Sequence, residues 1–332
     1  MRSIKTIRGL AALLIAVTIL ATSPELAAAK QKSITIHFEA VVGKQPFACG
    51  QSYDGIGLSK SRITPSDLRF FVSEVELIDN KGKAIPLKLE QDGIWQYRNV
   101  TLLDFENGSG PCLNGNIGLH TAISGTAPHK HYQRLRFTLG IPADLNHGDS
   151  TIAPPPLNVT SLFWTWRAGY KFFRLDMATT AFPLLPKLNS KVADDKSTET
   201  EEKDNAVAIK VGEDKDDETA SKVGKKKKKV SGFPIHLGST NCVSPTRTTP
   251  PTSCAHPNRV TVNFDDFDAE KNVIVVDIAS LLQDTNVDYH ARNSVAGCMA
   301  DIKDEDCKSI MANFGAPFNE QLAFPQHFLR VR

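Results

Sequence analysis

Residues 68–77 read LRFFVSEVEL, and this stretch is typical of a strand that is buried in a β-sheet. Apolar and polar residues largely alternate along it, as expected where successive side chains point to opposite faces of a sheet. The same pattern is found in SITIHFEAVV at 33–42 and in LRFTL at 135–139. Two further runs, Val260–Phe264 and Val273–Asp277, are rich in valine, isoleucine and phenylalanine, which favour strands.

Turn-forming clusters separate these strands, and helical periodicity is confined to short pieces. The clusters lie at 79–82 (DNKG), 91–93 (QDG) and 106–110 (ENGSG), whereas only 278–283 and 307–314 show a helical pattern. Short strands with frequent turns are typical of antiparallel sheets. The sequence therefore predicts an all-β, mainly antiparallel fold, a β-sandwich or barrel, in one domain with a few short helices.

The N-terminus is typical of a secretory signal peptide. Arg2, Lys5 and Arg8 precede the apolar run 10–20, and the alanines at 27–29 are suited to cleavage. We expect residues 1–29 to be removed and residues 30–332 to form the mature domain, which is periplasmic or, alternatively, secreted. No later apolar run is long enough for a membrane helix, so no stable membrane insertion is expected.

The charge balance gives no reason to expect nucleic-acid binding. Removing three basic residues and one acidic residue with the signal peptide reduces the totals from 39 and 37 to 36 of each. Residues 187–230, here called the charged insertion, are dense in both signs of charge and contain no aromatic residue. We expect this insertion to be a disordered, solvated loop, although its run Lys225–Lys229 alone would also suit an anionic partner.

The six cysteines indicate a protein stabilised by disulfide bonds. Fifteen pairings are formally possible. Cys242–Cys254 and Cys298–Cys307 would each close a short loop, which leaves Cys49–Cys112 as a long-range bond. The alternative is that the cysteines bind zinc or copper as thiolates, which an oxidising compartment disfavours.

Eight blocks of the sequence, in order, carry a resemblance to a known family. They are PFACGQSYDGIG, LRFFVSEVELID, IPLKLEQDGIWQYRNVTLLDFENGSGPC, LRFTLGIPADLNH, PPLNVTSLFWTWRAGYKFFRLD, HLGSTNC, CAHPNRVTV and GCMADIKDEDC. In these blocks the chain resembles the MbnP family of exported copper-binding proteins, also called the four-cysteine member of the metallo-mystery pair. The likeness runs from about Ser33 to the C-terminus and skips only the charged insertion.

This resemblance implies a periplasmic, β-rich protein that binds copper. It also implies a partner, a di-haem, MauG-like peroxidase that oxidises a tryptophan of the copper protein to kynurenine. By resemblance we assign this modification to Trp166, with Trp164 as the second choice. In an extended strand the two side chains would face the same side, whereas Trp95 is expected to fill the core.

Imidazole is the expected copper ligand where thiols are held in disulfides. Three of the nine histidines, His37, His147 and His236, lie in blocks that match the family, and the resemblance favours them as metal ligands. His37 lies on the strand face opposite Ile36 and Phe38, so it faces a site or the core. The pair His129 and His131 is an alternative chelating pair in a loop.

The sequence does not indicate an enzyme. It contains no Gly-x-Ser-x-Gly, His-Glu-x-x-His or phosphate-binding glycine motif. The alternative to copper binding is a metal-free, disulfide-stabilised module that binds a carbohydrate or peptide on its tryptophans.

Overall fold

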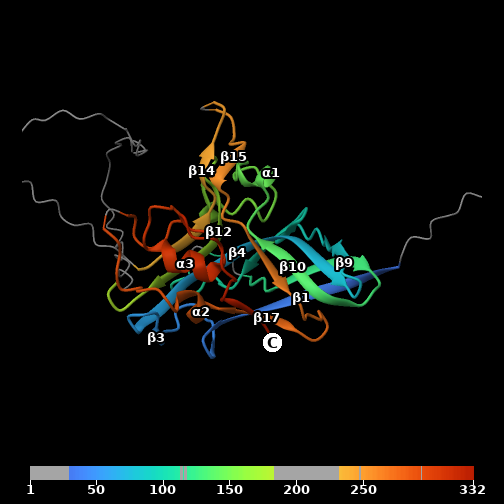
Figure 1. Ribbon diagram of the computed structural model, residues 1–332, viewed down its shortest axis with the longest axis horizontal. Helices are drawn as coiled ribbons and strands as arrows, with labels where there is room; N and C mark the ends of the chain where they lie inside the picture. The colour runs from blue at the N-terminus through green and yellow to red at the C-terminus, as the bar shows by residue number, and fades with distance from the viewer. Residues whose placement is uncertain (1–29, 113–114, 116–117, 183–231, 247, 293) are drawn as a thin grey trace, which may run out of the picture.

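The computed structural model describes residues 30–112, 115, 118–182, 232–246, 248–292 and 294–332. They form two packed β-sheets with a few short helices (Figure 1). The all-β, mainly antiparallel sandwich predicted from the sequence is confirmed. The predicted signal peptide and the charged insertion both lie outside the described residues.

The first sheet has six strands in the order β18-β17-β1-β9-β6, with β2 paired to β1. Strands β1 and β17 are parallel, and the other pairs are antiparallel. The strands are β1 (Gln31–Val42), β2 (Gln45–Pro46), β6 (Lys88–Leu89), β9 (Ala122–Pro128), β17 (Val273–Asp277) and β18 (Leu329–Val331).

The second sheet has ten strands and is organised around β4. This strand contains the predicted stretch 68–77 and pairs with β3, β5, β8, β10 and β12. The strands are β3 (Tyr53–Ile56), β4 (Ser61–Asp79), β5 (Ala84–Pro86), β7 (Gln96–Tyr97), β8 (Val100–Asp104), β10 (Tyr132–Leu139), β11 (Phe163–Thr165), β12 (Gly169–Ala178), β13 (Ile235–Gly238) and β16 (Val260–Phe264).

The remaining elements are short. They are the ribbon of β14 (Thr240–Val243) and β15 (Ser253–His256), the helices α1 (Ala143–Asn146), α2 (Ile278–Leu282) and α3 (Cys307–Phe314), and the 3-10 turn η1 (Thr160–Leu162). Both predicted helical pieces are confirmed as α2 and α3. The carboxylate of Asp277 accepts from two backbone N–H groups and caps α2, while Gly315 ends α3 at a φ of 88°.

The main core lies between the two sheets. Strand β1 sends Ile36 and Phe38 inward, and Phe38 meets Phe137 of β10 edge to face at 6.0 Å. Burying a side chain of this size contributes about 1.5–3 kcal/mol. The alternation predicted for 33–42 therefore determines which face of the six-stranded sheet is covered.

A second apolar cluster covers the outer face of the ten-stranded sheet. On β4, Phe70 points into the main core and Phe71 points outward, where it meets Tyr170 of β12 at 5.8 Å. The members of this cluster are Phe71, Val100, Leu102, Ile141, Leu157, Leu162, Tyr170 and Phe172. Three of them, Ile141, Leu157 and Leu162, come from the segment between β10 and β12, so that segment is fixed against the outer face.

The three disulfides predicted from the sequence are confirmed as Cys49–Cys112, Cys242–Cys254 and Cys298–Cys307. No cysteine is free. Such bonds are typical of extracellular and periplasmic proteins. None of the described helices has the length and apolar character needed to cross a membrane.

Candidate metal centre

A cluster of charged side chains lies on the outer face of the ten-stranded sheet, beside the second apolar cluster. On β4, the buried Arg69 donates to both oxygens of Asp67 at 2.9 and 2.6 Å. On β12, Arg174 lies 3.1 Å from Asp67 and 2.6 Å from Asp176. These residues are two positions apart on each strand, so alternation places them all on the same face as Phe71 and Phe172.

His236 of β13 joins this cluster. Its neighbours Ile235 and Leu237 point into the main core, so His236 faces outward, where Nε2 lies 2.7 Å from Oδ1 of Asp176. Burial raises the pKa of Asp176, but the hydrogen bond with His236 and the charge of Arg174 outweigh it and lower the pKa to about 2. An ionised carboxylate can only accept, so Nε2 carries the proton. The lone pair of a neutral His236 then lies on Nδ1, as in metal-binding histidines that are held by a carboxylate.

His147 follows α1, in the segment that covers the outer face, and its exposed fraction is only 7%. Its Nδ1 lies 3.0 Å from the backbone oxygen of Trp166, which can only accept, so Nδ1 carries the proton. Burial lowers the pKa of His147, which favours the neutral ring, although the hydrogen bond to Trp166 opposes the shift. The lone pair therefore lies on Nε2, the nitrogen that a soft metal ion would bind.

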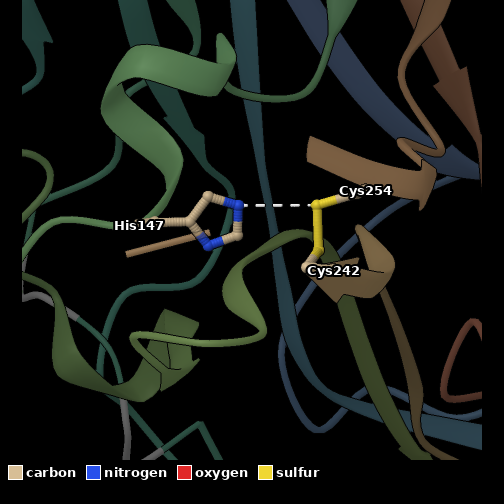
Figure 2. A group of neighbouring side chains, drawn as sticks. All are labelled: His147, Cys242 and Cys254. Carbon is tan, nitrogen blue, oxygen red and sulfur yellow. Dashed lines mark hydrogen bonds between the residues drawn. A yellow bond between two sulfur atoms is a disulfide. The ribbon is translucent and has the colours of Figure 1, made fainter. Parts of the chain in front are cut away.

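Nε2 of His147 faces the disulfide of the β14–β15 ribbon (Figure 2). It lies 3.5 Å from Sγ of Cys254, and the ligand atoms of His147, Cys242 and Cys254 are all within 4.8 Å of one another. The pocket beside them has a volume of about 300 Å³. In the oxidised protein the two sulfurs are bonded to each other, so they are not thiolates.

Asn146 holds His147 in place. The Oδ1 atom of Asn146 accepts from the backbone N–H of Tyr170 at 3.0 Å, while Nδ2 donates to the lone pair of Nε2 of His147 at 3.2 Å and lies 3.4 Å from Oγ of Ser239. A metal ion bound at Nε2 would take the place of this contact with Asn146. A single buried amide thereby ties α1, β12 and the start of the ribbon together. Gly169 makes room for it, since a Cβ at Gly169 would lie 2.5 Å from Oδ1 of Asn146.

We expect Gly169→Ala to destabilise the protein by about 1–3 kcal/mol, because alanine would be strained at a φ of 80° and would displace Asn146. Gly93→Ala is the matched control, since Gly93 also has a positive φ of 74° but has open space at its Cβ position. Thermal unfolding of the two variants measures the difference. Equal destabilisation would show that the contact with Asn146 contributes nothing.

The tryptophans differ in their surroundings. Strand β11 ends at Thr165, so Trp166 lies in the turn before β12 and the same-face argument from an extended strand does not apply to it. The Arg167 guanidinium lies over the half-buried ring of Trp166, 5.2 Å from the ring centroid. The backbone oxygen of Trp166 accepts the hydrogen bond from Nδ1 of His147. Trp164 is half-buried against the main core, and Trp95, expected to fill the core, is half-buried against the second cluster.

His37 lies elsewhere. It is exposed on the outer face of the six-stranded sheet, between Val273 of β17 and Ala122 of β9. The main core separates that face from the outer face of the ten-stranded sheet, where His147 and His236 lie. Among the described residues, the groups with converging metal-ligand atoms include His147 but neither His37 nor His236. The structure therefore does not bring the three predicted histidines together.

Sequence reasoning missed the residues that hold the histidines. A signal was present, since the pairs Asp67/Arg69 and Arg174/Asp176 each place two charges on one face of an apolar strand. Asn146 offered no such signal beyond its position next to His147. The ring of His120 stacks on that of Trp95, with the ring centroids 5.1 Å apart, a contact that the sequence did not indicate.

Comparison with known proteins agrees with this fold. The structure of MbnP from Methylosinus trichosporium has a TM-score of 0.70 and 24% sequence identity, and the match covers 91% of this chain and 98% of that one. No curated protein matches the chain. The family model for MbnP matches residues 31–300, most of the chain. The chain therefore belongs to the MbnP family.

Proposed function

We propose that this chain is a periplasmic copper-binding protein and that His147 supplies a copper ligand. The observation that carries the proposal is the orientation of His147, whose Nδ1 is tied to the oxygen of Trp166 while Nε2 presents its lone pair toward the pocket beside Cys254. A neutral imidazole fixed through its other nitrogen is the usual arrangement for a metal ligand. Family membership supports copper as the ion.

His236 is a second candidate ligand, which the family resemblance favours, although among the described residues its ligand atoms do not converge with those of His147. Its hydrogen bond to Asp176 has the same orienting effect, and Asp176 is itself held by Arg174. Both histidines extend from the outer face of the ten-stranded sheet, on β13 and on the segment that covers it. His37, on the far side of the main core, stays a prediction from the family resemblance alone.

The protein is a substrate in this proposal and not a catalyst. A di-haem, MauG-like peroxidase oxidises Trp166, opening the indole ring to give kynurenine. Two observations support Trp166 over Trp164: its backbone contacts His147, and its ring lies outside the main core, whereas Trp164 packs against it. The Arg167 side chain is the only cation that stacks on a tryptophan among the described residues.

Intact mass tests this modification. In protein made together with the di-haem partner, conversion of one tryptophan to kynurenine adds about 4 Da, because one carbon is lost and one oxygen is gained. We expect the shift to be absent from Trp166→Phe and present in Trp164→Phe and Trp95→Phe. A shift that survives in Trp166→Phe and disappears in Trp164→Phe would move the assignment to Trp164.

Copper titration separates the proposal from the metal-free binding module. A copper protein takes up about one equivalent through His147, whereas a carbohydrate- or peptide-binding module has no copper uptake that depends on this residue. Metal analysis of protein purified from its native host gives the same distinction without added copper.

A further inference from the structure

The Cys242–Cys254 bond differs from the other two disulfides in its surroundings. All six cysteines lie within the described ranges, and only Cys242 and Cys254 form a pair in which neither residue is buried. Cys298 and Cys307 are both fully buried, and Cys112 is fully buried in the remaining bond. A reductant in solution therefore reaches the Cys242–Cys254 bond before the others.

The Cys242–Cys254 bond joins the two strands of a ribbon whose base is also held by other contacts. Cys242 and Cys254 are directly opposite one another on the β14–β15 ribbon, which pairs with no further strand in the part of the chain that the structure describes. The base of the ribbon is closed by other contacts, from Oγ of Ser239 to the oxygen of Pro257 at 2.9 Å and from Asn258 to the oxygen of Gly238 at 2.9 Å. Opening the bond leaves these contacts in place.

Among the described residues, His147 is the histidine grouped with these sulfurs, and its Nε2 lies 3.5 Å from Sγ of Cys254. The ligand atoms of His147, Cys242 and Cys254 already lie within 4.8 Å of one another (Figure 2). The pocket of about 300 Å³ lies beside His147 and Cys254. On reduction the two sulfurs would move apart, and an ion between them would remain within reach of Nε2 of His147, which lies 3.5 Å from Sγ of Cys254. Two thiolates and one imidazole form a soft donor set that suits Cu(I).

We infer that the redox state of the Cys242–Cys254 pair controls copper binding. Reduction of their disulfide by a dithiol would create a three-coordinate Cu(I) site with His147. The dithiol is oxidised to its own disulfide as the Cys242–Cys254 bond gains two electrons and two protons. Cu(I) then displaces the two thiol protons. In the reverse exchange a disulfide in solution oxidises the pair and is itself reduced to a dithiol. Both thiolates are then lost and His147 remains, so copper binds more weakly to the oxidised protein.

The inference rests on the proposed function in one respect, namely that His147 is a copper ligand. It adds a means of regulation that the proposed function lacks, because the strength of copper binding then depends on whether one half-buried disulfide is reduced. The sulfurs in the oxidised bond are poor donors, whereas thiolates are among the strongest donors for Cu(I).

The experiment compares Cu(I) affinity before and after selective reduction. The purified protein is treated with a phosphine reductant, desalted without oxygen, and titrated with Cu(I) against a chromophoric chelator. Alkylation and mass spectrometry of a parallel sample identify the reduced cysteines. We expect Cys242 and Cys254 to be alkylated first and the Cu(I) affinity to rise by at least about tenfold, a factor that corresponds to about 1.4 kcal/mol.

Two variants separate the contribution of the cysteine pair to Cu(I) affinity from that of His147. In the double variant Cys242→Ser/Cys254→Ser, copper binding of the untreated protein should persist and the rise on reduction should disappear. His147→Ala should lower affinity in both states. An affinity that stays unchanged while Cys242 and Cys254 are alkylated would overturn the inference, as would alkylation of Cys298 or Cys307 first. Neither result bears on the proposed function, which fails only if the oxidised protein binds no copper through His147.

Discussion

His147→Ala is expected to lower the copper affinity of the oxidised protein by at least about 100-fold. Loss of a residue that merely orients a metal ligand costs about 10–100-fold in affinity, so loss of the ligand itself should reach or exceed the upper end. The variant removes the only nitrogen whose lone pair faces the Cys242–Cys254 pocket in the described part of the chain. A competition titration with a chromophoric chelator measures the change.

Two further histidine variants make this result specific. His327→Ala is the matched control, since His327 is exposed and has no proposed role, and its affinity should equal that of the parent. His37→Ala tests the ligand predicted from the family resemblance. Given its place on the other sheet, we expect no loss. A loss in His37→Ala together with normal binding by His147→Ala would place copper on the six-stranded sheet and contradict the proposal.

Arg69→Met should cause the largest loss of stability, about 3–5 kcal/mol. Arg69 is fully buried and neutralises Asp67 through two hydrogen bonds, and removing it leaves buried carboxylates without enough positive charge. Two more acids lie close by: Oε1 of Glu106 is 3.8 Å from Arg69 Nε, and burial raises the pKa of Asp104 to about 7. For a domain of this size the loss corresponds to a melting temperature lowered by at least about 6 °C.

Arg62→Met is the control for this effect. Arg62 also makes two hydrogen bonds to an aspartate, Asp54, but both side chains are about two-thirds exposed. Exposed pairs of this kind contribute about 0–1 kcal/mol. Thermal or denaturant unfolding should therefore show a small change for Arg62→Met and a large one for Arg69→Met. Equal changes would show that the buried charge cluster contributes nothing special to stability.

The sequence predicted the local features of this fold well because their causes are local. The alternation in 33–42 and 68–77 appears as β1 and β4, and the helical pieces after Asp277 and at Cys307 appear as α2 and α3. The short loops between neighbouring cysteines indicated two of the disulfides, and the two remaining cysteines formed the third. In each case the residues that decide the structure are close together in the chain.

The site was predicted less completely because its geometry depends on contacts between distant segments. His236 is oriented by the hydrogen bond that it donates to Asp176, 60 residues away, and Cys254, which faces His147, is 107 residues away from it. No periodicity in the sequence carries such information. Strand position alone could not show that His37 lies on the other sheet, since alternation fixes the face of a strand and not the sheet to which it belongs.

The most direct test of the account is to locate copper in crystals of the copper-loaded protein by anomalous scattering at the copper absorption edge. We expect a peak within bonding distance of Nε2 of His147, on the outer face of the ten-stranded sheet. A copper peak at His37, or a fully loaded protein with no peak at His147, would contradict it.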